Sequence, residues 1–128
     1  MSPGGGSRSY AEGPMRSPKE LLTAYVKAHN AGFRSGDFEP VNELLHATAS
    51  MRFYGIEMGP FDSAEAILQG FRVHPPDDEL VVQSIRAVGN KTAEATYSWA
   101  SAPGKLAGRL HVVALRELIS AIRIEVFS

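Results

Sequence analysis

The chain ends in LVVQSIRAV (residues 80–88), TAEATYSWA (92–100), KLAGRLHVVAL (105–115) and LISAIRIEVF (118–127). Each segment is rich in β-branched and other apolar residues, and short stretches with glycine, proline or charged residues separate them, which is typical of strands joined by turns. Residues 80–128 therefore predict an antiparallel meander. A sheet of this kind needs a cover on one face, and the N-terminal half of the chain contains candidate helices.

The composition predicts one soluble domain of ordinary globular type. The chain has 128 residues, 44% hydrophobic and 21% charged, with a formal net charge of −1. This balance gives no reason to expect binding to nucleic acid or to an anionic membrane. There is no cysteine, which excludes disulfides and thiolate chemistry and fits a cytoplasmic protein. No apolar run approaches the roughly 18–20 residues of a membrane helix, and no signal peptide is apparent.

The N-terminal region predicts a tail followed by a helix. Residues 1–17 are rich in Gly, Ser and Pro and predict a flexible tail, so the folded domain is expected to cover residues 18–128. Ser17 as N-cap, Pro18 at the first helical position and Glu20 three residues after the cap indicate a helix start. We expect this helix to end at Gly32, a residue suited to the left-handed conformation, and residues 33–36 to form a loop.

Two further helices and a short strand are expected between residues 37 and 73. Asp37 predicts the cap of a second helix, in which Val41, Leu44 and Leu45 recur at helical spacing. Residues 51–54 predict a short strand. Asp62 or Ser63 then caps a third helix that starts at residue 64. Helices on one side of an antiparallel sheet make an α+β layer architecture.

Four segments before the meander carry a resemblance to a known family: LLTAYVKAHNAG (21–32), GDFEPVNELL (36–45), MRFYG (51–55) and GPFDSAEAILQGF (59–71). With the meander that follows, they resemble SnoaL-like and ketosteroid-isomerase-like proteins. Both belong to the nuclear-transport-factor-2-like (NTF2-like) superfamily, whose fold is also called cystatin-like. The resemblance implies a cone-shaped α+β barrel with three N-terminal helices packed on a curved antiparallel sheet. It also implies a hydrophobic ligand pocket in the open end and a homodimer formed through the sheet.

The resemblance also suggests roles for individual residues. Ketosteroid isomerases carry an oxyanion-hole tyrosine on the first helix, where this chain has Tyr25, and a protonated aspartate on the penultimate strand, where it has His111. Their general base is a carboxylate on the first short strand, and Phe53 lies nearest that position here. Epoxide hydrolases of the superfamily use an Asp-Arg-Asp set, of which this chain offers only Arg109. The chain therefore lacks the complete set of catalytic residues for either reaction.

Strand parity predicts which residues face the covered side. If Glu117 and Leu118 form a two-residue turn, His111 pairs with Ile124, and Val113 with Ile122, on one apolar face. The opposite face then carries Arg123 and Glu125 and suits solvent or a partner subunit. An odd-numbered turn would reverse both faces, because a slip of one residue moves every side chain to the other side of the sheet. On the preceding segment, residues 92–100, we expect Tyr97 and Trp99 to face inward. Placing them on the same face as His111 requires a loop with an odd number of residues or a bulge, for which Gly108 is a candidate.

These patterns predict a cavity that binds a hydrophobic small molecule, with Tyr25 and His111 as acid/base candidates. The expected ligand contacts are His29, Tyr54, Phe71, Tyr97, Trp99, Ile122 and Ile124. The four histidines show no metal-ligand spacing, and no phosphate loop or nucleophile elbow is present, so neither a metal nor another cofactor is expected. Three hypotheses remain open. The domain is an isomerase or cyclase acting on a hydrophobic ring compound, a non-catalytic binding or dimerisation module, or a protein-interaction module similar to nuclear transport factor 2.

Overall fold

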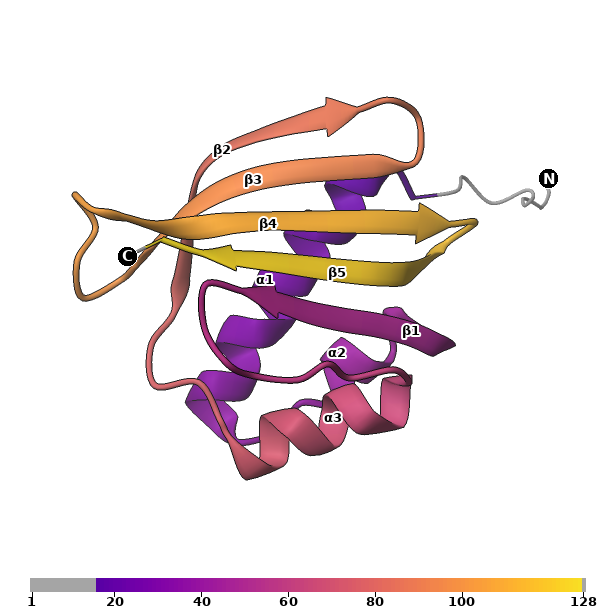
Figure 1. Ribbon diagram of the computed structural model, residues 1–128, viewed down its shortest axis with the longest axis horizontal. Helices are drawn as coiled ribbons and strands as arrows, with labels where there is room; N and C mark the ends of the chain where they lie inside the picture. Colours follow the sequence, from indigo (N-terminus) through magenta and orange to yellow (C-terminus); the bar gives the residue numbers. More distant parts are fainter. Residues whose placement is uncertain (1–15, 128) are drawn as a thin grey trace, which may run out of the picture.

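The computed structural model describes residues 16–127 and has a mixed α+β architecture (Figure 1). The predicted tail, residues 1–17, lies outside the described residues except for Arg16 and Ser17. The elements in chain order are α1 (Pro18–Ser35), α2 (Glu39–Asn42), β1 (Leu45–Tyr54), α3 (Ala64–Val73), β2 (Leu80–Val88), β3 (Thr92–Trp99), β4 (Leu106–Leu115) and β5 (Leu118–Val126). None of the helices in residues 16–127 is long and apolar enough to cross a membrane.

The five strands form one curved sheet in the order β1-β5-β4-β3-β2 (Figure 1). The predicted meander is confirmed: β2, β3, β4 and β5 pair antiparallel, each with the next strand in the chain. The sheet is not wholly antiparallel, because β1 joins its edge parallel to β5. Helix α1 packs against β2, β3 and β4, and α3 packs against β1, so the helices cover one face.

Helix α1 begins as predicted and ends later than predicted. The Ser17 hydroxyl accepts a hydrogen bond from the Glu20 N–H at 3.1 Å, and the Glu20 carboxylate accepts one from the Ser17 N–H at 2.7 Å, which completes a capping box. The expected end at Gly32 is wrong. Gly32 lies inside the helix with its Cα against the buried Phe38 ring, and the left-handed cap is Gly36, with φ 81°.

The second helix is shorter than expected, and the first strand is longer. The N-cap of α2 is Phe38 and not the predicted Asp37, although the Asp37 carboxylate accepts the Glu39 N–H at 3.0 Å, and α2 makes only one turn. Leu44 and Leu45, which were expected to continue this helix, instead lead into β1, and the Leu44 carbonyl accepts the N–H of Ile119 in β5. The long-range pairing with β5 therefore overrides a local helical spacing. Helix α3 starts as predicted, with the Ser63 hydroxyl accepting the Ala66 N–H at 3.0 Å.

The register between β4 and β5 reverses the predicted face of β4. The turn residues are Arg116 and Glu117, so Leu115 pairs with Leu118, and an irregularity between Val113 and Ala114 then shifts the register by one residue. Beyond this bulge, Leu110 pairs with Ile124 and Val112 with Ile122. Leu110 and Val112 are buried, and His111 and Val113 lie on the opposite face.

Candidate functional site

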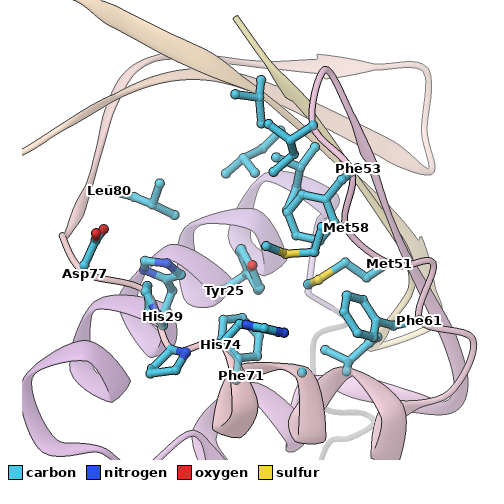
Figure 2. Close-up of a pocket in the computed structure, with 18 of the residues that line it drawn as sticks. Tyr25, His29, Met51, Phe53, Met58, Phe61, Phe71, His74, Asp77 and Leu80 are labelled. Atoms are coloured by element: carbon cyan, nitrogen blue, oxygen red, sulfur yellow. The ribbon is translucent and has the colours of Figure 1, made fainter.

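A cavity of about 320 Å³ lies between α1, α3, the covered face of the sheet and the segments around residues 56–61 and 74–77 (Figure 2). Most of its wall is aromatic or aliphatic. Its lining residues are Tyr25, His29, Met51, Phe53, Ile56, Met58, Phe61, Ile67, Gly70, Phe71, His74, Pro75, Pro76, Asp77, Leu80, Tyr97, Trp99, Leu110, Ile124 and Val126. A mostly apolar wall with a few polar groups is the usual composition of a small-molecule site.

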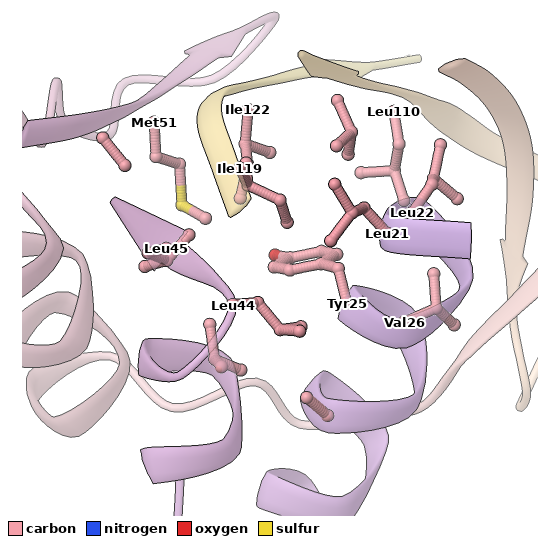
Figure 3. Packing of buried hydrophobic residues seen from close by; sticks show 14 of the residues in the cluster. Leu21, Leu22, Tyr25, Val26, Leu44, Leu45, Met51, Leu110, Ile119 and Ile122 are labelled. Atoms are coloured by element: carbon pink, nitrogen blue, oxygen red, sulfur yellow. The ribbon is translucent and has the colours of Figure 1, made fainter. Parts of the chain in front are cut away.

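Tyr25 projects from α1 into the interior and is 1% exposed. Its ring packs among the core side chains Leu21, Leu44 and Ile119, and its oxygen points to the side where Met51 lies (Figure 3). Burial, with a smaller contribution from Tyr97, raises the pKa of the Tyr25 phenol above its ordinary value of 10.0. Among residues 16–127 the phenol makes no hydrogen bond. It is therefore a protonated group that can donate to a ligand at neutral pH.

His29 lies one turn after Tyr25 on the same face of α1 and is also buried. Its ring is surrounded by the rings of Tyr25, Phe71 and Trp99, with centroids 6.3, 6.1 and 6.4 Å away. The Nδ1 atom lies 2.9 Å from the Asn30 side-chain oxygen. Burial lowers the pKa of His29 below its ordinary value of 6.5, while the bond to Asn30 and the Glu79 carboxylate oppose this effect. The imidazole is consequently neutral near pH 7.

The aromatic wall extends from the sheet to α3. Tyr97 and Trp99 face inward as predicted, with their rings edge to face at 5.6 Å. A register shift between Tyr97 and Ser98 accompanies the inward placement, beside Gly108. A Cβ at Gly108 would lie 2.6 Å from the Tyr97 hydroxyl oxygen, so the missing side chain makes room for that phenol.

Asp77 and His29 lie toward one end of the cavity, and Tyr25 lies nearer its middle (Figure 2). Asp77 is the only carboxylate that lines it within the described residues, and this side chain is exposed at the mouth. His74 lines the same region. The described part of the chain contains no group of His, Asp and Glu side chains that could hold a metal ion.

The structure brings six of the nine predicted site residues around this cavity: Tyr25, His29, Phe71, Tyr97, Trp99 and Ile124. Ile122 faces the same side of the sheet but is buried in the core rather than lining the cavity. The expected inward orientation of Tyr54 is wrong, because its ring is 48% exposed and lies beneath the Arg123 guanidinium at 5.0 Å on the other face.

The expected position of His111 in the cavity is also wrong. The register of β4 places it on the uncovered face, where its Nε2 lies 3.3 Å from a carboxylate oxygen of Glu94 and 3.3 Å from one of Glu125. Both glutamates also contact arginines: Glu94 pairs with Arg86, and Glu125 with Arg109 and Arg123. Although His111 Nε2 is buried, it makes no hydrogen bond within the described residues.

Sequence reasoning missed the part of the wall formed outside the meander. Met58 and Phe61 come from the connection between β1 and α3, and Pro75, Pro76 and Asp77 come from the connection before β2. Loop residues have no periodicity from which a buried face can be read. The available signal was local composition, since IEMGPF (56–61) carries four apolar side chains.

Comparison with known proteins gives a fold. No family model and no curated protein matches the sequence. Solved structures do match. An NTF2-like protein of unknown function from Cytophaga hutchinsonii has TM-score 0.67 at 14% identity, covering 90% of this chain and 93% of that one.

Two other matches come from proteins with provisionally assigned activities. One from Kribbella flavida, provisionally assigned as a ketosteroid isomerase, has TM-score 0.62 at 14% identity, covering 88% of this chain and 82% of that one. One from Sinorhizobium meliloti, provisionally assigned as a polyketide cyclase, has TM-score 0.63 at 15% identity, covering 81% and 92%. The chain therefore has the NTF2-like fold that the phrases of its sequence predicted.

Proposed function

We propose that this protein binds a small, largely apolar, ring-containing molecule in the cavity beside Tyr25 and His29. The observation that carries the proposal is the composition of the wall, where a few buried polar side chains, Tyr25 and His29 among them, project among aliphatic and aromatic ones. Apolar surface supplies affinity by leaving water, and a few polar groups fix orientation. The proposal includes the cone-shaped barrel that the resemblance implies, with the cavity in its open end.

The chemistry best supported at this site is acid/base work of the isomerase or cyclase type. The Tyr25 phenol stays protonated and can donate to a carbonyl oxygen on which negative charge develops. The neutral imidazole of His29 can accept a proton, which is the role of a general base. His111 is no longer a candidate for this role, because it lies on the opposite face of the sheet.

The alternative is a non-catalytic binding or dimerisation module. It is favoured by the shortage of carboxylates, since Asp77 is the only one lining the cavity in residues 16–127 and it lies at the exposed mouth. A protein that only holds its ligand needs no strong base. Turnover assays with ring-containing ketones distinguish the enzyme from the non-catalytic module. If the wild type exchanges protons next to the carbonyl of the ketone and His29→Gln does not, the protein is an enzyme.

Homodimerisation through the sheet is part of the proposal and is supported by the uncovered face. Side chains of both signs alternate there, including Glu94, Arg109, Arg123 and Glu125, and the helices lie on the other side (Figure 1). Such a surface can pair with a second copy of itself across a two-fold axis. Sedimentation of wild type and Arg123→Glu tests this: a wild-type dimer that dissociates in the variant supports it, and a wild-type monomer contradicts it.

The ligand claim is tested by a thermal-shift screen of steroid-like and polyketide-like compounds. Compounds that stabilise the wild type should lose this effect in Met58→Trp, which puts a larger side chain into the cavity. The matched control is Val73→Trp, which places the same ring at an exposed position of α3 outside the cavity. Equal shifts in all three proteins would contradict binding at this site.

A further inference from the structure

The side chain of Asn30 is held on the backbone of Leu80 by two hydrogen bonds. The Asn30 amide nitrogen donates to the Leu80 carbonyl at 2.9 Å, and the Asn30 side-chain oxygen accepts the Leu80 N–H at 2.8 Å. A flipped amide would set a donor against a donor and an acceptor against an acceptor. The pairing therefore fixes which atom of Asn30 is the oxygen.

This orientation fixes the tautomer of His29. The atom 2.9 Å from His29 Nδ1 is the Asn30 oxygen, which can only accept, so Nδ1 carries the hydrogen and donates it. In the neutral ring, Nε2 then has a lone pair and no hydrogen. Within residues 16–127 the imidazole makes no other hydrogen bond, so this lone pair is left for the cavity that the ring lines.

The surroundings keep the ring neutral and disfavour an anionic ligand. Burial lowers the pKa of His29, and the nearby Glu79 carboxylate is itself paired with Arg34 at 2.6 Å. No lysine or arginine lines the cavity within the described part of the chain, whereas Asp77 is at its mouth. A carboxylate or phosphate on the ligand would therefore lose its hydration without a cation to replace it.

We propose that His29 Nε2 is an acceptor subsite that selects a neutral ligand carrying a hydroxyl or N–H donor, and that Asn30 is its positioning residue. This inference rests on the proposed function of the same cavity. Tyr25 and His29 then bind two different groups of the ligand. The Tyr25 phenol donates a hydrogen bond to an oxygen of the ligand, and the His29 imidazole accepts a hydrogen bond from a hydroxyl or N–H of the ligand. A ligand with both groups on one ring system satisfies both side chains.

The test uses two probes with the same rings and oxygen, one with a hydroxyl hydrogen to donate and one with a methyl group in its place. 2-Naphthol carries a hydroxyl, and 2-methoxynaphthalene carries the same rings and oxygen without the hydrogen. Dissociation constants are measured by isothermal titration calorimetry at pH 7. We expect wild type to bind 2-naphthol roughly 3- to 10-fold more tightly, the value of one hydrogen bond. His29→Phe keeps a ring of similar shape and should bind both probes equally.

Two further variants keep the test decisive. His46→Phe makes the same change on β1 outside the cavity, where the His46 ring bonds the Leu115 carbonyl, and should retain the preference. Asn30→Asp places a carboxylate beside Nδ1, which favours a doubly protonated ring whose Nε2 donates, so the preference for 2-naphthol should fall or invert.

The outcomes separate the subsite from the proposed function. Equal binding of both probes to wild type, or a preference that persists in His29→Phe, would overturn the acceptor subsite and leave the apolar site intact. If neither probe binds wild type, the proposed function fails and the subsite with it. If His29→Phe does not fold, the wild-type pair and Asn30→Asp still decide the matter, because the preference must exist and must then change.

Discussion

Replacing Gly32 by alanine should destabilise the protein although the residue lies inside a helix. A Cβ at this position would overlap the Cδ1 and Cε1 atoms of Phe38 and lie 3.0 Å from its Cγ, closer than ordinary contacts of 3.4 Å or more. Phe38 is 5% exposed, and its ring stacks on Phe71 with centroids 4.8 Å apart. Because Phe71 lines the cavity, a displacement of the stacked Phe38 ring would disturb the wall of the proposed site.

The expected magnitude follows from three opposing contributions. Alanine is favoured over glycine in a helix interior by roughly 0.8–1.0 kcal/mol. Overpacking of a filled interior costs about 1–3 kcal/mol, and loss of the stacked pair adds about 0.5–1.5 kcal/mol. The net loss in the free energy of unfolding is therefore about 0.5–3.7 kcal/mol, and urea denaturation monitored by circular dichroism measures it.

A double-mutant cycle identifies the cause. Phe38→Leu removes the ring that the new methyl group meets, so the two substitutions together should cost less than their sum by about 1 kcal/mol or more. Gly36→Ala is the matched control: it strains a left-handed residue, φ 81°, that has nothing within 4 Å of its Cβ position, and it should not couple to Phe38→Leu. A stabilising Gly32→Ala, or an additive cycle, would refute the packing argument.

Three further predictions follow from the site. Because burial lowers the pKa of His29 below 6.5, the unfolded chain binds its proton first, so wild type should lose stability as pH falls below about 6.5, and His29→Gln should lose less over the same range by denaturant titration. Because burial raises the pKa of Tyr25 above 10.0, its contribution to stability should be present below about pH 10 and lost above it. Absorbance at 295 nm should show a late phenolate component that Tyr25→Phe reduces but does not abolish, because burial also raises the pKa of Tyr97. Gly108→Ala would place a Cβ against the Glu125 carbonyl oxygen and 2.6 Å from the Tyr97 hydroxyl oxygen. This substitution should lower the free energy of unfolding by about 3 kcal/mol or prevent folding. The neighbouring control Ala107→Gly should lower it by less than about 1.5 kcal/mol.

The helix starts and the meander could be predicted because their signals are local. Ser17 and Ser63 are N-caps whose side chains bond backbone groups three residues away, and such short-range chemistry is visible in sequence. Gly32 shows the limit of this reasoning. A glycine can end a helix or allow close packing, and only the position of Phe38, brought in by the turn after α1, decides between them.

The position of His111 could not be predicted because it depends on a single residue of register. The apolar pattern of β5 was read correctly, since Ile122 and Ile124 face the covered side. The two-residue turn at Arg116 and Glu117 keeps the predicted parity, and the one-residue shift between Val113 and Ala114 alone reverses it, so that Leu110 and Val112 rather than His111 face the interior. The parallel pairing of β1 with β5 was likewise invisible, because its partners are about 70 residues apart in the chain.

A methyl NMR titration with 2-naphthol tests most directly whether the cavity beside Tyr25 and His29 holds an apolar ligand. Met51 and Met58 line the cavity, and the ¹³C-labelled methyl groups of methionine give separate signals for each. Both signals should move saturably as the probe is added, and Met58→Trp should abolish the change at Met51. Binding in this cavity would be contradicted if saturable shifts appeared instead at alanine and valine methyl groups of the uncovered sheet face, such as Ala121 and Val113, or if no methyl signal moved.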